Sequence, residues 1–127
     1  MSTEEFEQYA QEAYRAIPET IRGRIHNLAF VIKDRPGNDM EPDLLGCYIG
    51  VPTTEWESGY DSLPDMIMLF RENIKAEALE QDGDTARVIR ETVWHEVGHA
   101  LGIDEKRMEV YEQRWEAAWK KNKTLAI

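Results

Sequence analysis

Two histidines and a glutamate lie within one short segment, His95-Glu96-Val97-Gly98-His99. Capping residues and apolar periodicity predict a helix over 85–101, so residues at i and i+4 share one helix face. The imidazoles of His95 and His99 can therefore converge on one metal ion at about 2.0 to 2.1 Å. Glu96 lies about 100° further round the helix. This position puts its carboxylate beside the metal, where it can take a proton from water.

A catalytic zinc ion usually takes three protein ligands, so a third ligand is needed. The sequence continues to Glu105 in the pattern H-E-x-x-H-x-x-G-x-x-E. Gly102 can adopt the left-handed conformation that ends a helix and returns the chain toward the metal. Spacing favours Glu105 as the third ligand, with Asp104 as the alternative, and the predicted cofactor is Zn²⁺.

The elements that must position these residues indicate an α+β fold in one compact domain over residues 1–127. Capping and helical periodicity predict helices over 3–17, 71–81 and 85–101 and from Glu105 onward. Short apolar runs predict strands over 28–32, 44–51 and 66–70. The metal-binding helix therefore lies near the C-terminus and packs with a small sheet.

Composition limits the partners of the chain. Twenty-five acidic residues against fifteen Lys and Arg give a net charge of −10, which disfavours nucleic acid and anionic membrane surfaces. No apolar run is long enough to span a membrane, and the acidic N-terminus does not look like a secretory signal. The lone Cys47 excludes an internal disulfide and suits a reducing compartment. We therefore expect a soluble, cytoplasmic protein.

Three segments carry a family resemblance: LLGCYIGVP (44–52), LPDMIMLFRENI (63–74) and ETVWHEVGHALGIDE (91–105). They resemble, in order, the minimal zincin family of bacterial metallopeptidase-like proteins, whose extended motif is similar to that of the zincin metallopeptidases. The resemblance implies a zincin-like fold, metal ligands at His95, His99 and Glu105, and Glu96 as the base. It implies no substrate.

We therefore predict a zinc-dependent metallopeptidase that hydrolyses peptide bonds with a metal-activated water and Glu96 as general base. A peptide or protein substrate could pair with an exposed sheet edge, for which the strand over 66–70 is the candidate. The alternative is a non-catalytic zinc-binding interaction or substrate-binding module that uses the same site. Too few residues follow His99 to build the opposing wall of a protease cleft. The site should be shallow and open, or completed by a partner protein.

Several further residues have weaker assignments. Tyr48, Tyr60 and Tyr111 are candidate donors to a developing oxyanion, and the sequence does not choose among them. Met108 follows His99 too closely to be the methionine turn of the larger metzincins, and its place in a helical stripe indicates a core residue. His26 is interpreted as a surface residue, Cys47 as a small core residue and Trp56 as a loop residue that could contact a ligand.

Overall fold

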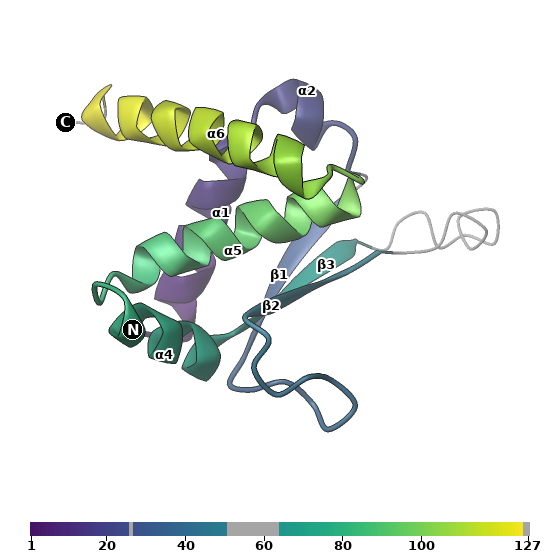
Figure 1. Ribbon diagram of the computed structural model, residues 1–127, viewed down its shortest axis with the longest axis vertical. Helices are drawn as coiled ribbons and strands as arrows, with labels where there is room; N and C mark the ends of the chain where they lie inside the picture. Colours follow the sequence, from purple (N-terminus) through teal and green to yellow (C-terminus); the bar gives the residue numbers. More distant parts are fainter. Residues whose placement is uncertain (26, 51–63, 126–127) are drawn as a thin grey trace.

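The sheet and helices are seen in a computed structural model that describes residues 1–25, 27–50 and 64–125 (Figure 1). The five helices of these residues are α1 (Thr3–Ala16), α2 (Glu19–Arg22), α4 (Arg71–Glu80), α5 (Thr85–Ala100) and α6 (Glu105–Leu125). The three strands are β1 (Leu28–Lys33), β2 (Gly46–Ile49) and β3 (Asp65–Phe70). They form a mixed sheet in the order β1-β3-β2, in which β3 is parallel to β1 and antiparallel to β2. The α+β prediction is confirmed.

The strand order corrects the predicted substrate-binding edge. β3, which covers the 66–70 run, is the central strand and pairs with both neighbours. Its backbone groups are used inside the sheet, so it cannot accept a peptide at its edge. Among the described strands, the free edges of the sheet belong to β1 and β2. Periodicity shows that a segment is a strand, but strand order depends on how the chain connects, and the prediction failed there.

Two other elements of the structure differ from the prediction. β2 begins at Gly46, two residues after the predicted start at Leu44, because Leu44 and Leu45 belong to the preceding loop although they are apolar. The short α2 was not predicted. It follows Pro18 and makes a single turn, which is too short to show a helical period. The N-cap of α1 is Ser2, whose side chain accepts a hydrogen bond from the Glu5 backbone N–H.

α5 lies at the centre of the fold, between α1, the sheet and α6 (Figure 1). Its buried face places Ile89, Val93 and Val97 in the core. The indole Nε1 of the buried Trp94 donates to the Ala13 carbonyl of α1 at 2.8 Å, and its ring meets Trp115 of α6 edge to face. One helix is therefore fixed against two others, and its opposite face is held in a constant position.

α6 crosses over α5 and is anchored by Arg90, which is only 6% exposed. The guanidinium donates to both carboxylate oxygens of Glu116, at 3.2 and 3.1 Å. It also stacks 3.7 Å from the centre of the Trp119 ring. A bidentate ion pair with a cation–π contact resists sliding of one helix along the other. The start of α6 is thereby held near the end of α5.

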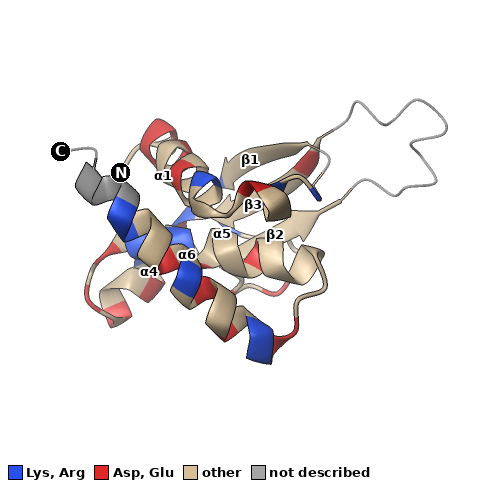
Figure 2. Cartoon of the chain, turned by 90° about the horizontal axis from the view of Figure 1, so that it is seen from above, with Lys and Arg blue, Asp and Glu red and all other residues tan. Residues whose placement is uncertain are grey.

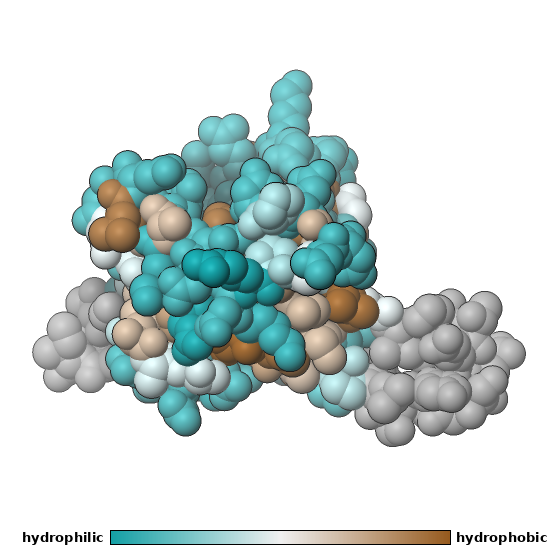
Figure 3. Space-filling model, turned by 90° about the horizontal axis from the view of Figure 1, so that it is seen from below, coloured by the Kyte–Doolittle hydropathy of each residue, from teal (hydrophilic) through white to brown (hydrophobic). Residues whose placement is uncertain are grey.

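The surface agrees with the composition. Hydrophilic side chains dominate the face in Figure 3, and apolar atoms reach the surface there only in patches. Lys and Arg gather along α6, whereas acidic residues are spread over several elements (Figure 2). Among the described residues, no helix is long and apolar enough to cross a membrane.

Candidate metal centre

The site is built on the side of α5 that lines a groove, where Val88 and Thr92 are buried. Val88, Glu91, Thr92, His95 and Glu96 repeat at helical spacing and line a common groove. The Asp84 side chain caps the helix by accepting the Arg87 backbone N–H at 3.1 Å. At the other end Gly102 has φ +73°, a conformation that a residue with a Cβ rarely adopts. This turn directs the chain into α6, as the sequence predicted.

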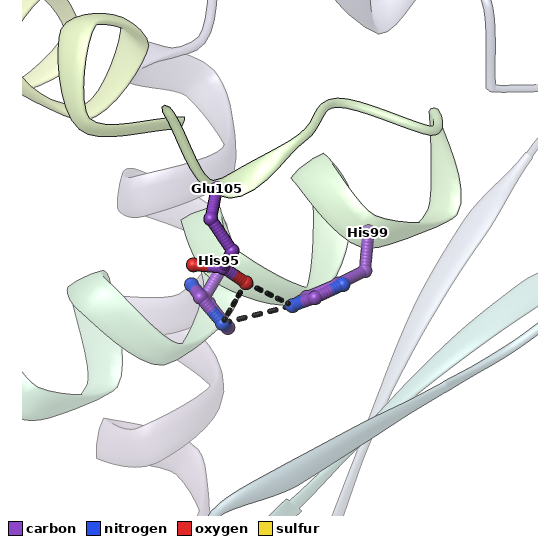
Figure 4. Close-up of side chains that lie close together, drawn as sticks. All are labelled: His95, His99 and Glu105. Carbon is purple, nitrogen blue, oxygen red and sulfur yellow. Dashed lines mark hydrogen bonds and ion pairs between the residues drawn. The ribbon is translucent and has the colours of Figure 1, made fainter. Parts of the chain in front are cut away.

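His95, His99 and Glu105 converge at this turn, with their side chains directed toward one another (Figure 4). The two imidazole Nε2 atoms lie 2.9 Å apart. Glu105 Oε1 lies 3.8 Å from His95 Nε2 and 3.4 Å from His99 Nε2. Tetrahedral ligands at zinc distances would be about 3.3 Å apart, and the observed separations bracket that value. Two imidazole nitrogens this close need a proton or a cation between them, so the donor set fits a zinc ion.

Asp104, the alternative third ligand, is engaged elsewhere. Its carboxylate Oδ1 accepts the Arg107 backbone N–H at 2.8 Å, and its carbonyl accepts the Met108 N–H at 2.8 Å. These are the bonds of a helix N-cap. Asp104 therefore starts α6, and Glu105, the first residue of that helix, is the carboxylate brought to the imidazoles.

Glu96 lies in the groove beside the imidazoles. Burial raises the pKa of its carboxyl above the ordinary value, while His99, His95 and the backbone amide of Tyr48 act in the opposite direction. A carboxyl with a raised pKa is suited to take up a proton and to release it again. Cys47 of β2 is only half-buried rather than a core residue, and burial and the nearby Glu96 raise the pKa of its thiol.

Sequence reasoning did not identify Glu112. Its Oε1 lies 3.5 Å from His95 Nδ1, on the side of the ring away from the Nε2 that faces Glu105. A carboxylate at Nδ1 favours the tautomer that leaves Nε2 free for a metal. Burial raises the Glu112 pKa and His95 opposes that shift. The available signal was the seven-residue spacing from Glu105, which puts both acids on one face of α6.

Met108 packs beneath the metal-binding helix. It is 2% exposed, which confirms its assignment to the core. A Cβ at Gly98, inside the HEVGH motif, would lie 2.0 Å from Met108 Sδ. Position 98 is therefore a glycine because α6 passes directly against α5 at this point. The close approach brings Glu105 and Glu112 within reach of His95.

The three candidate oxyanion donors have different surroundings, and one of them lies outside the described residues. The Tyr48 hydroxyl donates to Asp65 Oδ2 at 2.7 Å, and the Tyr111 ring packs against Trp115 at 5.9 Å. Tyr60, Trp56 and His26 lie outside the described residues. The Tyr48 hydroxyl is therefore engaged with Asp65.

The three converging side chains are exposed. In the part of the chain that the structure describes, the side chains of His95, His99 and Glu105 retain 44%, 51% and 73% of their accessible surface. Among the described residues, the groove beside these side chains is lined by α4, α5, α6, β2 and the loop before β2. The centre is therefore open, with ready access for a ligand.

Comparison with known proteins places this geometry in context. Residues 25–115 match the model of a family described as zincin-like metallopeptidase. The match runs from the residues before β1 into α6, and it includes all residues of the centre. No curated protein matches the chain significantly.

Proposed function

Because the chain belongs to the zincin-like metallopeptidase family, we propose that it is a zinc-dependent peptidase. His95, His99 and Glu105 hold the metal in this proposal, and Glu96 is the general base. The observation that carries it is the convergence of the three donor atoms within 4.8 Å of one another, with a partly buried carboxyl in the adjoining groove. A purely structural zinc site has no need for a base beside the metal.

Zinc supplies Lewis-acid polarisation of a carbonyl and makes water more acidic. The protein supplies the proton carrier. Glu96 accepts a proton from the attacking water and then passes it to the departing amine. Its raised pKa suits both steps, because a carboxylate of ordinary acidity would be a weaker base toward water. Glu112 holds the His95 ring with Nε2 toward the metal.

The free edge of β2 is the proposed platform for an extended peptide. β2 packs on α5, and its outer edge has no strand partner among the described residues. A peptide that pairs with this edge would make backbone hydrogen bonds to β2 while lying over the α5 face that carries Glu96. The other free edge, on β1, lies on the far side of the sheet from β2.

The test compares wild-type protein with Glu96→Gln at equal zinc occupancy on a mixed peptide library. We expect the variant to bind zinc with unchanged stoichiometry and to lose cleavage by at least about 100-fold, as for loss of a general base. Glu109→Gln, on an exposed position of α6, is the control and should cleave like wild type. Undiminished cleavage by Glu96→Gln would remove this residue from the mechanism.

The openness of the centre favours a second function, a zinc-binding module that docks a partner protein without turnover. The same three ligands serve both functions. The module predicts that the library stays intact with or without a chelator and that zinc controls partner binding. Cleavage that a chelator abolishes and zinc restores would exclude it.

A further inference from the structure

The metal centre opens into a groove of about 520 Å³ that extends along α5. Its floor is the side of α5 that carries Val88, Thr92 and His95. One wall comes from the loop before β2 and from α4, and the other includes Glu112 of α6. The size suits one large side chain with room to spare. His95 and Glu96 belong to this lining. In the proposed peptidase, the groove would therefore hold a substrate side chain close to the cleaved bond.

The charge of the groove is one-sided. Six carboxylates line it: Glu41, Asp43, Glu77, Glu91, Glu96 and Glu112. No Lys or Arg is among its described lining residues. The basic side chains Lys106, Arg107 and Arg114 line a separate hollow on α6. The acidic composition of the chain does not by itself explain why the described lining of the groove lacks cations. The chain has fifteen Lys and Arg residues, and none of them is in this lining.

Part of this negative charge has no cationic partner among the described residues, although Glu112 lies 3.5 Å from His95 Nδ1. Glu91 pairs with Arg87 at 3.0 Å, and Glu77 accepts a hydrogen bond from the neutral Gln81. Glu41 and Asp43, both exposed, form no ion pair with a described residue. A hollow lined by one sign of charge concentrates the opposite sign.

The apolar part of the lining selects among cations. Leu44 and Leu45 contribute to one wall, and the buried Val88 lies in the floor. An aliphatic stem with a charged end matches this combination, because Lys and Arg bury their methylenes against apolar surface and keep the charge near carboxylates. A bare metal ion would gain nothing from the leucines.

We propose that this groove is a specificity site that binds the side chain of an arginine or lysine residue next to the scissile peptide bond. The placement of this side chain beside a cleaved bond rests on the proposed peptidase function. The binding of a basic side chain rests on the groove alone. The chemical class of substrate is therefore a peptide with a basic residue beside the cleaved bond.

The experiment titrates the full-length, zinc-loaded chain with Nα-acetyl-arginine amide and with Nα-acetyl-norleucine amide, observed by amide NMR. We expect the arginine amide to shift the Leu45 and Val88 resonances and to bind about tenfold more tightly than norleucine, as two or three partly exposed ion pairs provide. Glu41→Gln with Asp43→Asn should cut that preference about threefold or more. Glu7→Gln with Glu12→Gln, the same charge change on exposed positions of α1, should not.

Equal binding of the two amides, or an unchanged preference in the groove double variant, would overturn the inference. Cleavage assays separate it from the proposed function. Cleavage that does not depend on a basic residue would support the peptidase function and contradict the specificity proposed for the groove. Arginine binding without any cleavage supports the groove and refutes the peptidase.

Discussion

At the residue scale, the centre depends on two adjacent acids with different tasks. Glu105 faces both imidazoles, whereas Asp104 caps α6. Glu105→Ala should therefore reduce zinc affinity by at least about 100-fold, because two imidazoles alone make a poor zinc site. Asp104→Ala should bind zinc nearly as well as wild type and lose about 1 kcal/mol of stability, the typical value of an N-cap. Zinc titration and chemical unfolding measure the two effects. The reverse pattern would exchange the two assignments.

Glu112 provides a second prediction at this scale. Glu112→Ala removes the acceptor at His95 Nδ1, and we expect zinc affinity to fall about 10- to 100-fold, as is typical when such a partner is lost. Glu112→Gln should recover much of the loss, because its amide oxygen still accepts the Nδ1 proton. Nitrogen chemical shifts of His95 report the tautomer directly. A retained tautomer and affinity in Glu112→Ala would show that Glu112 does not position the ring.

At the element scale, the site exists because α5 and α6 cross at a fixed place. Arg90 links them through Glu116 and Trp119. Arg90→Ala should cost about 2 kcal/mol, since it leaves a partly buried carboxylate without its partner. Zinc affinity should fall with it, because Glu105 is at the start of the released helix. Arg114→Ala, exposed on the same helix, is the control. Destabilisation without a change in zinc affinity would separate the anchor from the site.

Local signals explain how far the sequence predicted these elements. α5 begins at its predicted start because Asp84 caps it. It ends one residue before its predicted end, and Gly102 turns the chain after it. Leu44 and Leu45 misled the strand prediction, because their apolar side chains line the groove although both residues precede β2. The central position of β3 follows from chain connection, which no period in the sequence records.

The same reasoning applies to the centre. His95, Glu96, His99 and Glu105 were predictable because a helix and one turn fix their relative positions. Glu112 and the groove were not, because they depend on how α6, α4 and the loop before β2 pack around α5. Contacts between distant segments, such as that of Met108 with Gly98, arise from tertiary packing.

At the scale of the whole molecule, charge and openness act together. The chain carries a net charge of −10, with carboxylates concentrated around an exposed metal centre and cations along α6. In the proposed peptidase, such a field would attract cationic segments of a substrate. The prediction that the site is shallow agrees with the exposure of its three converging side chains. A small, selective peptidase fits this surface better than a broad one.

The coordination of zinc in the loaded protein tests the central claim most directly. X-ray absorption at the zinc edge, on wild-type chain loaded with one equivalent, should report two imidazole nitrogens, one carboxylate oxygen and one ligand that exchanges with solvent. The Glu105→Ala protein should lose the carboxylate contribution. A fourth protein ligand that closes the site, or the same spectrum from Glu105→Ala, would contradict the account.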